Sequence, residues 1–109
     1  MMIRYFLYVR KSTDSEDRQI LSIEGQIEEC RQYAKKEGLL ISSEFTESQT
    51  AKEPGRPVFN EMIARIEKGE AEGIISWHPD RLARNSLDGG KIIYLIDKEI
   101  IKDLKISHL

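Results

Sequence analysis

The sequence predicts an α/β fold of three layers, in which helices cover both faces of a mainly parallel central sheet of about four strands. Short apolar runs typical of buried strands alternate with segments whose apolar residues recur every three or four positions, as on one face of a helix. Parallel strands need long crossover connections, and helices of this length supply them. We therefore expect one continuous domain over residues 1–109.

The first strand and the first helix are the clearest elements. Met2–Val9 is an apolar and aromatic run that only Arg4 interrupts, as expected for a buried central strand. Ser22 is a suitable N-cap for a helix that ends at Gly38. The residues expected on its buried face are Ile23, Ile27, Cys30 and Ala34.

A second strand and a second helix follow the same pattern. Leu39–Phe45 is expected to be a strand, and Glu47–Arg56 a polar loop. Pro57 suits the first position of a helix that ends at Gly69. The apolar face of this helix is expected to comprise Phe59, Met62, Ile63 and Ile66.

The last third of the chain completes the alternation. Gly73–Trp77 predicts a short buried strand, and Ser86–Lys98 a helix that its central glycine pair weakens. Ile100–Ile106 predicts the fourth strand.

Composition excludes several functional classes. The net charge of −2 gives the domain no overall basic excess for holding DNA, so an anion must be met by a local cluster. Cys30 is the only cysteine, which excludes an internal disulfide and a multi-cysteine zinc site, and it is expected to be a core residue. No apolar run approaches the roughly 18 residues of a membrane span, and we expect a cytoplasmic protein of bacterial, phage or mobile-element origin.

Arginines gather where the predicted strands end. In open parallel sheets, ligands bind beyond the carboxyl ends of the strands. Ser12 follows the first strand in phase with Tyr8, so their side chains can share a face. Four of the eight arginines follow a strand, namely Arg10, Arg56, Arg81 and Arg84.

Guanidinium groups around a hydroxyl indicate phosphate chemistry. Arginine matches phosphate oxygens with a planar fork of donors and stays charged. If a helix begins near Asp80, its carboxylate reaches Arg84 one turn later, whereas His78 is expected to be a loop residue. The sequence contains no phosphate-binding GxxxxGK[ST] loop and no aspartate-rich metal motif, so nucleotide- and metal-dependent mechanisms lose support.

Each candidate also has a purely structural interpretation. Tyr8 is typical of a core residue, and a serine after a strand, such as Ser12, is usually a turn or cap residue. Gln26 is equally typical of an exposed helix position. Charged residues near strand ends can be ordinary ion-pair partners or part of a solvated helix face, which applies to Glu47, Asp80, Arg81 and Arg84.

Four segments, taken in their order along the chain, resemble those of a known family. They are Tyr8–Thr13, Ser22–Gln26, Gly55–Pro57 and Asp80–Asn85. With them, nearly the whole chain resembles the catalytic domain of the serine recombinases, the resolvase and invertase family, especially its transposon and large phage integrase branch. The resemblance implies a resolvase-like fold and site-specific DNA strand exchange without a cofactor, metal or ATP.

The resemblance also implies residue roles. Ser12 matches the nucleophile, which cleaves and rejoins DNA through a 5′-phosphoserine intermediate. The groups that bind the scissile phosphate match Arg10, Arg81 and Arg84, with Arg56 as a further phosphate contact. Asp80 matches an aspartate that orients an arginine or handles a proton. The supporting residues match Tyr8, Gln26 and Glu47.

Two departures from the family accompany these matches. Residues Glu47–Lys52 lack the Ser-Gly pair that relatives commonly carry after the second strand. The family's dimerisation helix and DNA-binding region would follow Leu109, so we expect a truncated domain that does not recombine DNA by itself. The longer protein is expected to act on double-stranded DNA as a homodimer or tetramer.

Two other functions remain open from the sequence alone. The same fold could serve as a non-catalytic regulatory or assembly module, which Ser12 facing the core or arginines on separate faces would indicate. It could also be a small phosphodiester hydrolase with a serine nucleophile and no DNA specificity.

Overall fold

The computed structural model of the chain describes residues 2–13, 17 and 20–108. In chain order, its elements are β1 (Arg4–Arg10), α1 (Ile23–Glu37), β2 (Leu40–Glu47), α2 (Pro57–Glu67), β3 (Gly73–Ser76), α3 (Pro79–Leu82), α4 (Ser86–Asp97) and β4 (Asp103–Ile106). The strands and helices alternate as the sequence predicts, with the short helix α3 inserted between β3 and α4.

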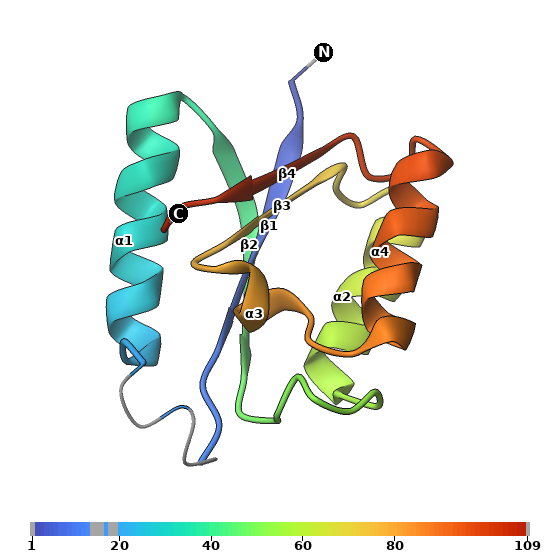
Figure 1. Cartoon of the computed structure of the whole chain (residues 1–109). Helices are drawn as coiled ribbons and strands as arrows, with labels where there is room; N and C mark the ends of the chain where they lie inside the picture. Colours follow the sequence, from blue (N-terminus) through green and yellow to red (C-terminus); the bar gives the residue numbers. More distant parts are fainter. Residues whose placement is uncertain (1, 14–16, 18–19, 109) are drawn as a thin grey trace.

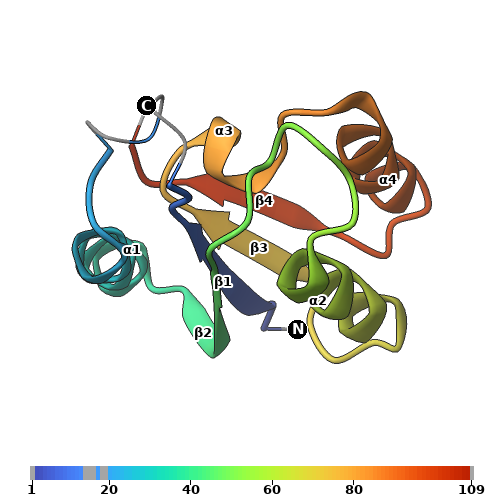
Figure 2. The ribbon, with the colours of Figure 1, turned by 90° about the horizontal axis from the view of Figure 1, so that it is seen from below.

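The four strands form one sheet in the order β2-β1-β3-β4, and all three neighbouring pairs are parallel. Helix α1 covers one face of the sheet, and α2 and α4 cover the other (Figures 1 and 2). This confirms the predicted three-layer α/β fold with a parallel sheet of four strands.

Two apolar clusters fill the two interfaces because successive side chains of a strand point to opposite faces. Phe6 and Tyr8 of β1 pack in the cluster beneath α2 and α4. Leu7 and Val9 pack in the cluster beneath α1, which also contains Cys30. Cys30 is fully buried, and burial raises the pKa of its thiol, as expected of a core residue.

The ends of α1 follow the predicted capping residues. The Ser22 hydroxyl accepts a hydrogen bond from the Gly25 amide at 3.1 Å, which satisfies a free N–H of the first turn. Gly38 ends the helix with φ of 69°, a left-handed conformation that glycine adopts without a steric cost. The glycine pair predicted to weaken α4 lies inside a continuous helix.

The fourth strand is shorter than predicted. It begins at Asp103 rather than Ile100, because the preceding residues terminate α4. The amides of Ile100 and Ile101 both donate to the Leu95 carbonyl, at 2.9 and 3.1 Å. Ile101, predicted as part of the strand, is buried in the core but lies in the turn before β4.

The strand register brings three loops to one edge of the sheet. Tyr8 of β1 lies beside Phe45 of β2 and Ser76 of β3, so the three strands run out together. The segments that follow them leave the sheet at the same end, where α3 also lies (Figure 1). This edge positions the candidate site.

Candidate active site

Ser12 lies two residues beyond β1 and is bound to Asp17, a residue of the loop between β1 and α1. The Ser12 hydroxyl donates to Asp17 Oδ2 at 3.0 Å, and the Ser12 amide donates to the same oxygen at 2.8 Å. Asp17 is 2% exposed and Ser12 9%. The hydroxyl is therefore held at the strand end, facing a buried carboxylate and not the apolar core.

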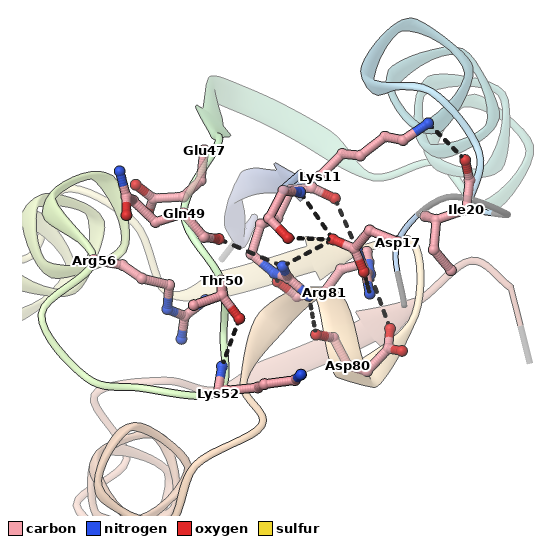
Figure 3. Close-up of polar contacts among 12 residues, drawn as sticks. Lys11, Asp17, Ile20, Glu47, Gln49, Thr50, Lys52, Arg56, Asp80 and Arg81 are labelled. Carbon is pink, nitrogen blue, oxygen red and sulfur yellow. Dashed lines mark hydrogen bonds and ion pairs between the residues drawn. The ribbon is translucent and has the colours of Figure 1, made fainter. Parts of the chain in front are cut away.

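Two predicted arginines, Arg10 and Arg81, donate to the same carboxylate, and Figure 3 shows Arg81 beside Asp17. Arg81 forms a bidentate pair with it, from NH1 to Oδ2 at 3.0 Å and from NH2 to Oδ1 at 2.9 Å. Arg10 NH1 donates to Asp17 Oδ2 at 3.3 Å. We call Ser12, Arg10, Arg81 and Asp17 the serine cluster.

The opposite charges of the serine cluster stabilise one another. Burial disfavours the Asp17 carboxylate, but hydrogen bonds from Arg81 and Ser12 outweigh it and hold the pKa of Asp17 well below its usual range. Burial also opposes the Arg81 charge, but hydrogen bonds to Asp17 and Asp80 raise the pKa of Arg81. Burial and the neighbouring Arg81 charge lower the pKa of Arg10, which stays protonated because a guanidinium is so basic.

Arg10 is also fixed by main-chain oxygens on two other segments. Its Nε and NH2 groups donate to the carbonyls of Arg81 at 3.2 Å and Asp80 at 2.8 Å. NH1 additionally donates to the Gln49 carbonyl at 3.4 Å. The Arg10 side chain thus connects β1 to α3 and to the loop after β2.

Gln26 is a buried support for the end of β1. Its side-chain amide accepts from the Arg10 amide at 3.3 Å and donates to the Arg10 carbonyl at 3.0 Å. It donates also to the Leu21 carbonyl at 2.9 Å and is fully buried. The alternative interpretation of Gln26, as an exposed helix residue, is therefore wrong.

Asp80 contacts a different arginine from the one predicted. Its Oδ1 accepts from Arg81 Nε at 2.9 Å and lies 3.0 Å from His78 Nδ1. The expected one-turn pairing with Arg84 is wrong because α3 ends at Leu82 and Ala83 is extended. Arg84 is exposed, and its amide donates to the Ala51 carbonyl at 3.2 Å. His78 caps α3 by accepting from the Asp80 amide.

Arg56 lies in a second buried cluster, apart from Asp17 in Figure 3. Its NH1 donates to the Tyr8 hydroxyl at 3.0 Å, and its NH2 donates to Asp88 Oδ2 at 3.0 Å. The guanidinium carbon lies 4.1 Å from the centre of the Phe59 ring. Its Nε is the one buried side-chain polar atom without a partner within the described residues.

Glu47 links this second cluster to the start of α2. Its Oε1 accepts from the Tyr8 hydroxyl at 2.9 Å and from the Phe59 amide at 2.8 Å. Burial raises the pKa of Tyr8 far above its usual value, so this hydroxyl keeps the proton that it donates. The carboxylate takes the place of an N-cap side chain, because Arg56 at the N-cap makes no capping bond. We call Arg56, Tyr8, Glu47 and Asp88 the Arg56 cluster.

The sequence predictions missed two carboxylates, Asp17 and Asp88. A buried guanidinium needs a counter-charge, so an acid near Arg10 and another near Arg56 were to be expected. The loop after β1 contains several acids, and periodicity does not select among them. Asp88 lies in the first turn of α4, where an acid is also ordinary, so it carried no separate signal.

Two kinds of feature are absent from residues 2–13, 17 and 20–108. In that part of the chain, no group of three or more His, Cys, Asp or Glu residues is arranged to hold a metal ion. No helix there has both the length and the apolar character needed to cross a membrane.

Comparisons with solved structures show the same fold in serine recombinases. The C-terminal catalytic domain of ISC1926 TnpA, an IS607-like serine recombinase, superposes with a TM-score of 0.78 at 18% identity, over 98% of this chain and 69% of that one. The N-terminal catalytic domain of TP901-1 integrase gives 0.72 at 26% identity, over 91% and 71%. A resolvase family site-specific recombinase from Streptococcus pneumoniae gives 0.71 at 21% identity, over 96% and 72%.

Sequence comparison identifies the family. None of the curated proteins matches the chain. The family model for the resolvase N-terminal domain matches residues 5–102. This range includes the carboxyl ends of β1, β2 and β3. Because this match covers most of the chain, the chain belongs to the resolvase family and is a catalytic domain of the serine site-specific recombinases.

Proposed function

We propose that Ser12 is the nucleophile of DNA strand exchange. Its Oγ forms a bond to the phosphorus of a backbone phosphodiester, the bond from phosphorus to the 3′ oxygen breaks, and the serine proton leaves while the 3′ oxygen gains one. The products are a 5′-phosphoserine link and a free 3′-hydroxyl. Rejoining reverses these steps without ATP, because the covalent link conserves the energy of the phosphodiester.

A single observation carries this proposal. The Ser12 hydroxyl and two buried guanidiniums, those of Arg10 and Arg81, bind one carboxylate oxygen, Oδ2 of Asp17. A carboxylate is an anion with oxygen acceptors, as a phosphate is, so the donors that hold it are those that a phosphate requires. Guanidiniums held in place before reaction stabilise the charge that develops in the transition state.

The remaining predicted residues take subordinate roles. Asp80 orients Arg81 by accepting from the Arg81 Nε group. Gln26 holds the end of β1, two residues before Ser12, by donating to the Arg10 carbonyl. Arg84, which is exposed, is proposed to contact the scissile phosphate from the solvent side of the site. Arg56, which the sequence predicted as a further phosphate contact, is proposed instead to hold the elements around the site together, because its NH groups donate to Tyr8 and Asp88.

The proposed substrate is double-stranded DNA, and the proposed working form is a homodimer or tetramer of a longer cytoplasmic protein. With a net charge of −2 the domain has no overall basic excess, so we infer that further basic surface helps to hold the DNA. The 109-residue domain is proposed to contain the reacting groups but not to complete recombination alone.

The test is a denaturing gel of the recombinase incubated in EDTA with DNA that carries its crossover site. We expect a covalent protein-DNA band for the wild type and none for Ser12→Ala. Replacement of the hydroxyl removes one hydrogen bond to Asp17, so the variant should stay folded by circular dichroism. A band that persists in Ser12→Ala would contradict the assigned nucleophile, and no wild-type band on a verified site would favour a non-catalytic module.

A further inference from the structure

Asp17 is the centre of the serine cluster, yet its carboxylate has more donors than one oxygen can serve well. Oδ2 lies within 3.3 Å of the Ser12 amide, the Ser12 hydroxyl and one NH group each of Arg10 and Arg81. A carboxylate oxygen offers about two lone-pair positions. The four donors therefore exceed the lone-pair positions that this oxygen provides.

The same donors suit a larger anion. A main-chain N–H, a hydroxyl and two guanidiniums are the groups that bind phosphate oxygens in proteins. A phosphodiester distributes its negative charge over two free oxygens and carries two ester oxygens as well, so it can accept from more directions than Oδ2. Arg81 already presents two parallel NH groups, to Oδ1 and Oδ2.

We propose that Asp17 is a positioning residue that holds Ser12, Arg10 and Arg81 around an anion position and competes with the DNA phosphate for that position. This inference rests on the proposed function, because it takes the serine cluster as the place where the scissile phosphate binds. Strand cleavage then requires the Asp17 carboxylate to move away from the four donors, so that a phosphate oxygen can take the place of Oδ2.

A second role for Asp17 would be to take the proton of Ser12. Hydrogen bonds from Arg81 and Ser12 hold the pKa of Asp17 far below neutrality, which makes the carboxylate a weak base. The Ser12 hydroxyl that would attack is also directed at Asp17 while the carboxylate is in place. The geometry therefore favours competition with the phosphate over proton transfer.

Competition has a measurable consequence for affinity. When only a fraction of molecules has the anion position open, the apparent dissociation constant is the intrinsic one divided by that fraction. Removal of the Asp17 carboxylate opens the position in all molecules. We expect Asp17→Ala to bind a small anion at least about tenfold more tightly than the wild type, which corresponds to at least a tenfold larger open fraction.

The experiment titrates the 109-residue chain with sodium sulfate at constant ionic strength and follows the Ser12 amide by NMR and the Tm by calorimetry. In Asp17→Ala, sulfate should saturate at a lower concentration than in the wild type and should raise the Tm that the substitution lowers. The matched control is Asp88→Ala, which also removes the carboxylate of a buried arginine pair, with the Arg56 side chain 1% exposed. Sulfate should not restore its Tm, because Asp88 accepts from one guanidinium, that of Arg56, and from no serine within the described residues.

Two further variants keep the test decisive if Asp17→Ala unfolds. Asp17→Asn removes the charge and keeps the size, and it should also bind sulfate more tightly than the wild type. Asp17→Asn combined with Arg81→Gln should lose that gain, because the bidentate donor is gone. Equal sulfate affinity in the wild type and Asp17→Asn would overturn the proposal.

The covalent DNA assay separates this inference from the proposed function. If the wild type forms the Ser12-dependent link and Asp17→Asn still forms it, competition is supported. If Asp17→Asn alone loses the link, Asp17 is the proton acceptor and the competition proposal is wrong. If the wild type forms no link, the proposed function fails, and the sulfate comparison alone decides whether Asp17 occupies an anion position.

Discussion

The serine cluster and the Arg56 cluster are both buried, and both join guanidinium to carboxylate, but their charge balance differs. Among the described residues of the serine cluster, two guanidiniums share one buried carboxylate, that of Asp17. Asp80 adds a second carboxylate beside Arg81, but 35% of its side chain is exposed. In the Arg56 cluster, one guanidinium lies among two buried carboxylates, Glu47 and Asp88.

This difference distinguishes an anion-binding site from a cluster that only stabilises the fold, which we call a brace. An excess of guanidinium attracts a further anion, whereas a cluster with an excess of carboxylate repels one. The groups of the Arg56 cluster come from β1, β2 and α4, and they hold these elements together. The serine cluster depends on a carboxylate from a loop, and a loop residue can be exchanged for a ligand at lower cost than a residue of a helix or strand.

The largest effect that would test this comparison is on cleavage by Arg10→Lys. A lysine keeps the charge but lacks the fork that reaches Asp17 and the carbonyls of Asp80 and Arg81 together. We expect the rate of covalent complex formation to fall by roughly 10² to 10³, as when a transition-state donor is lost. Arg31→Lys is the matched control, because Arg31 forms an exposed pair with Glu44, and its rate should be unchanged. A near-normal rate in Arg10→Lys would show that a point charge is sufficient.

The next effect is on stability in the Arg56 cluster. Asp88→Ala leaves the buried Arg56 guanidinium without its carboxylate and should lower the free energy of unfolding by about 3 to 5 kcal/mol, measured in urea. Glu44→Ala breaks an ion pair whose arginine side chain is 58% exposed, and it should cost at most about 1 kcal/mol. If both substitutions cost the same, the Arg56 cluster does not act as a brace.

The sequence was sufficient to predict the fold because each element has its own local signal. The capping residues of α1 and the proline at the start of α2 fix the helix ends, and the apolar runs indicate β1, β2 and β3. The predicted start of β4 was wrong, whereas its end at Ile106 was right, because apolar residues such as Ile100 serve equally well at a helix terminus. A local pattern does not distinguish a buried turn from a buried strand.

The site was predicted only as far as its arginines and its serine. Arg10 ends β1 and Arg81 follows β3, and only the parallel register brings them together, so the fold prediction was needed first. Their shared partner Asp17 lies in a loop with other acids and without periodicity, so no pattern selects it. Arg56 was predicted correctly to follow a strand end, but its pairing with Asp88 depends on how α4 packs, which a local pattern does not contain.

The smallest effect is that of Tyr8→Phe, which removes one atom from the Arg56 cluster. The Tyr8 hydroxyl accepts from Arg56 NH1 and donates to Glu47 Oε1, which still accepts from the Phe59 amide when the hydroxyl is gone. Only the buried NH1 loses a partner, so the free energy of unfolding should fall by about 1 to 2 kcal/mol, less than for Asp88→Ala. Covalent complex formation should keep a rate within a few-fold of the wild type if Tyr8 belongs to the brace. A loss of rate as large as that of Arg10→Lys, in a variant that urea unfolding shows to be stable, would place the Tyr8 hydroxyl and Arg56 at the phosphate and would join the two clusters into one site.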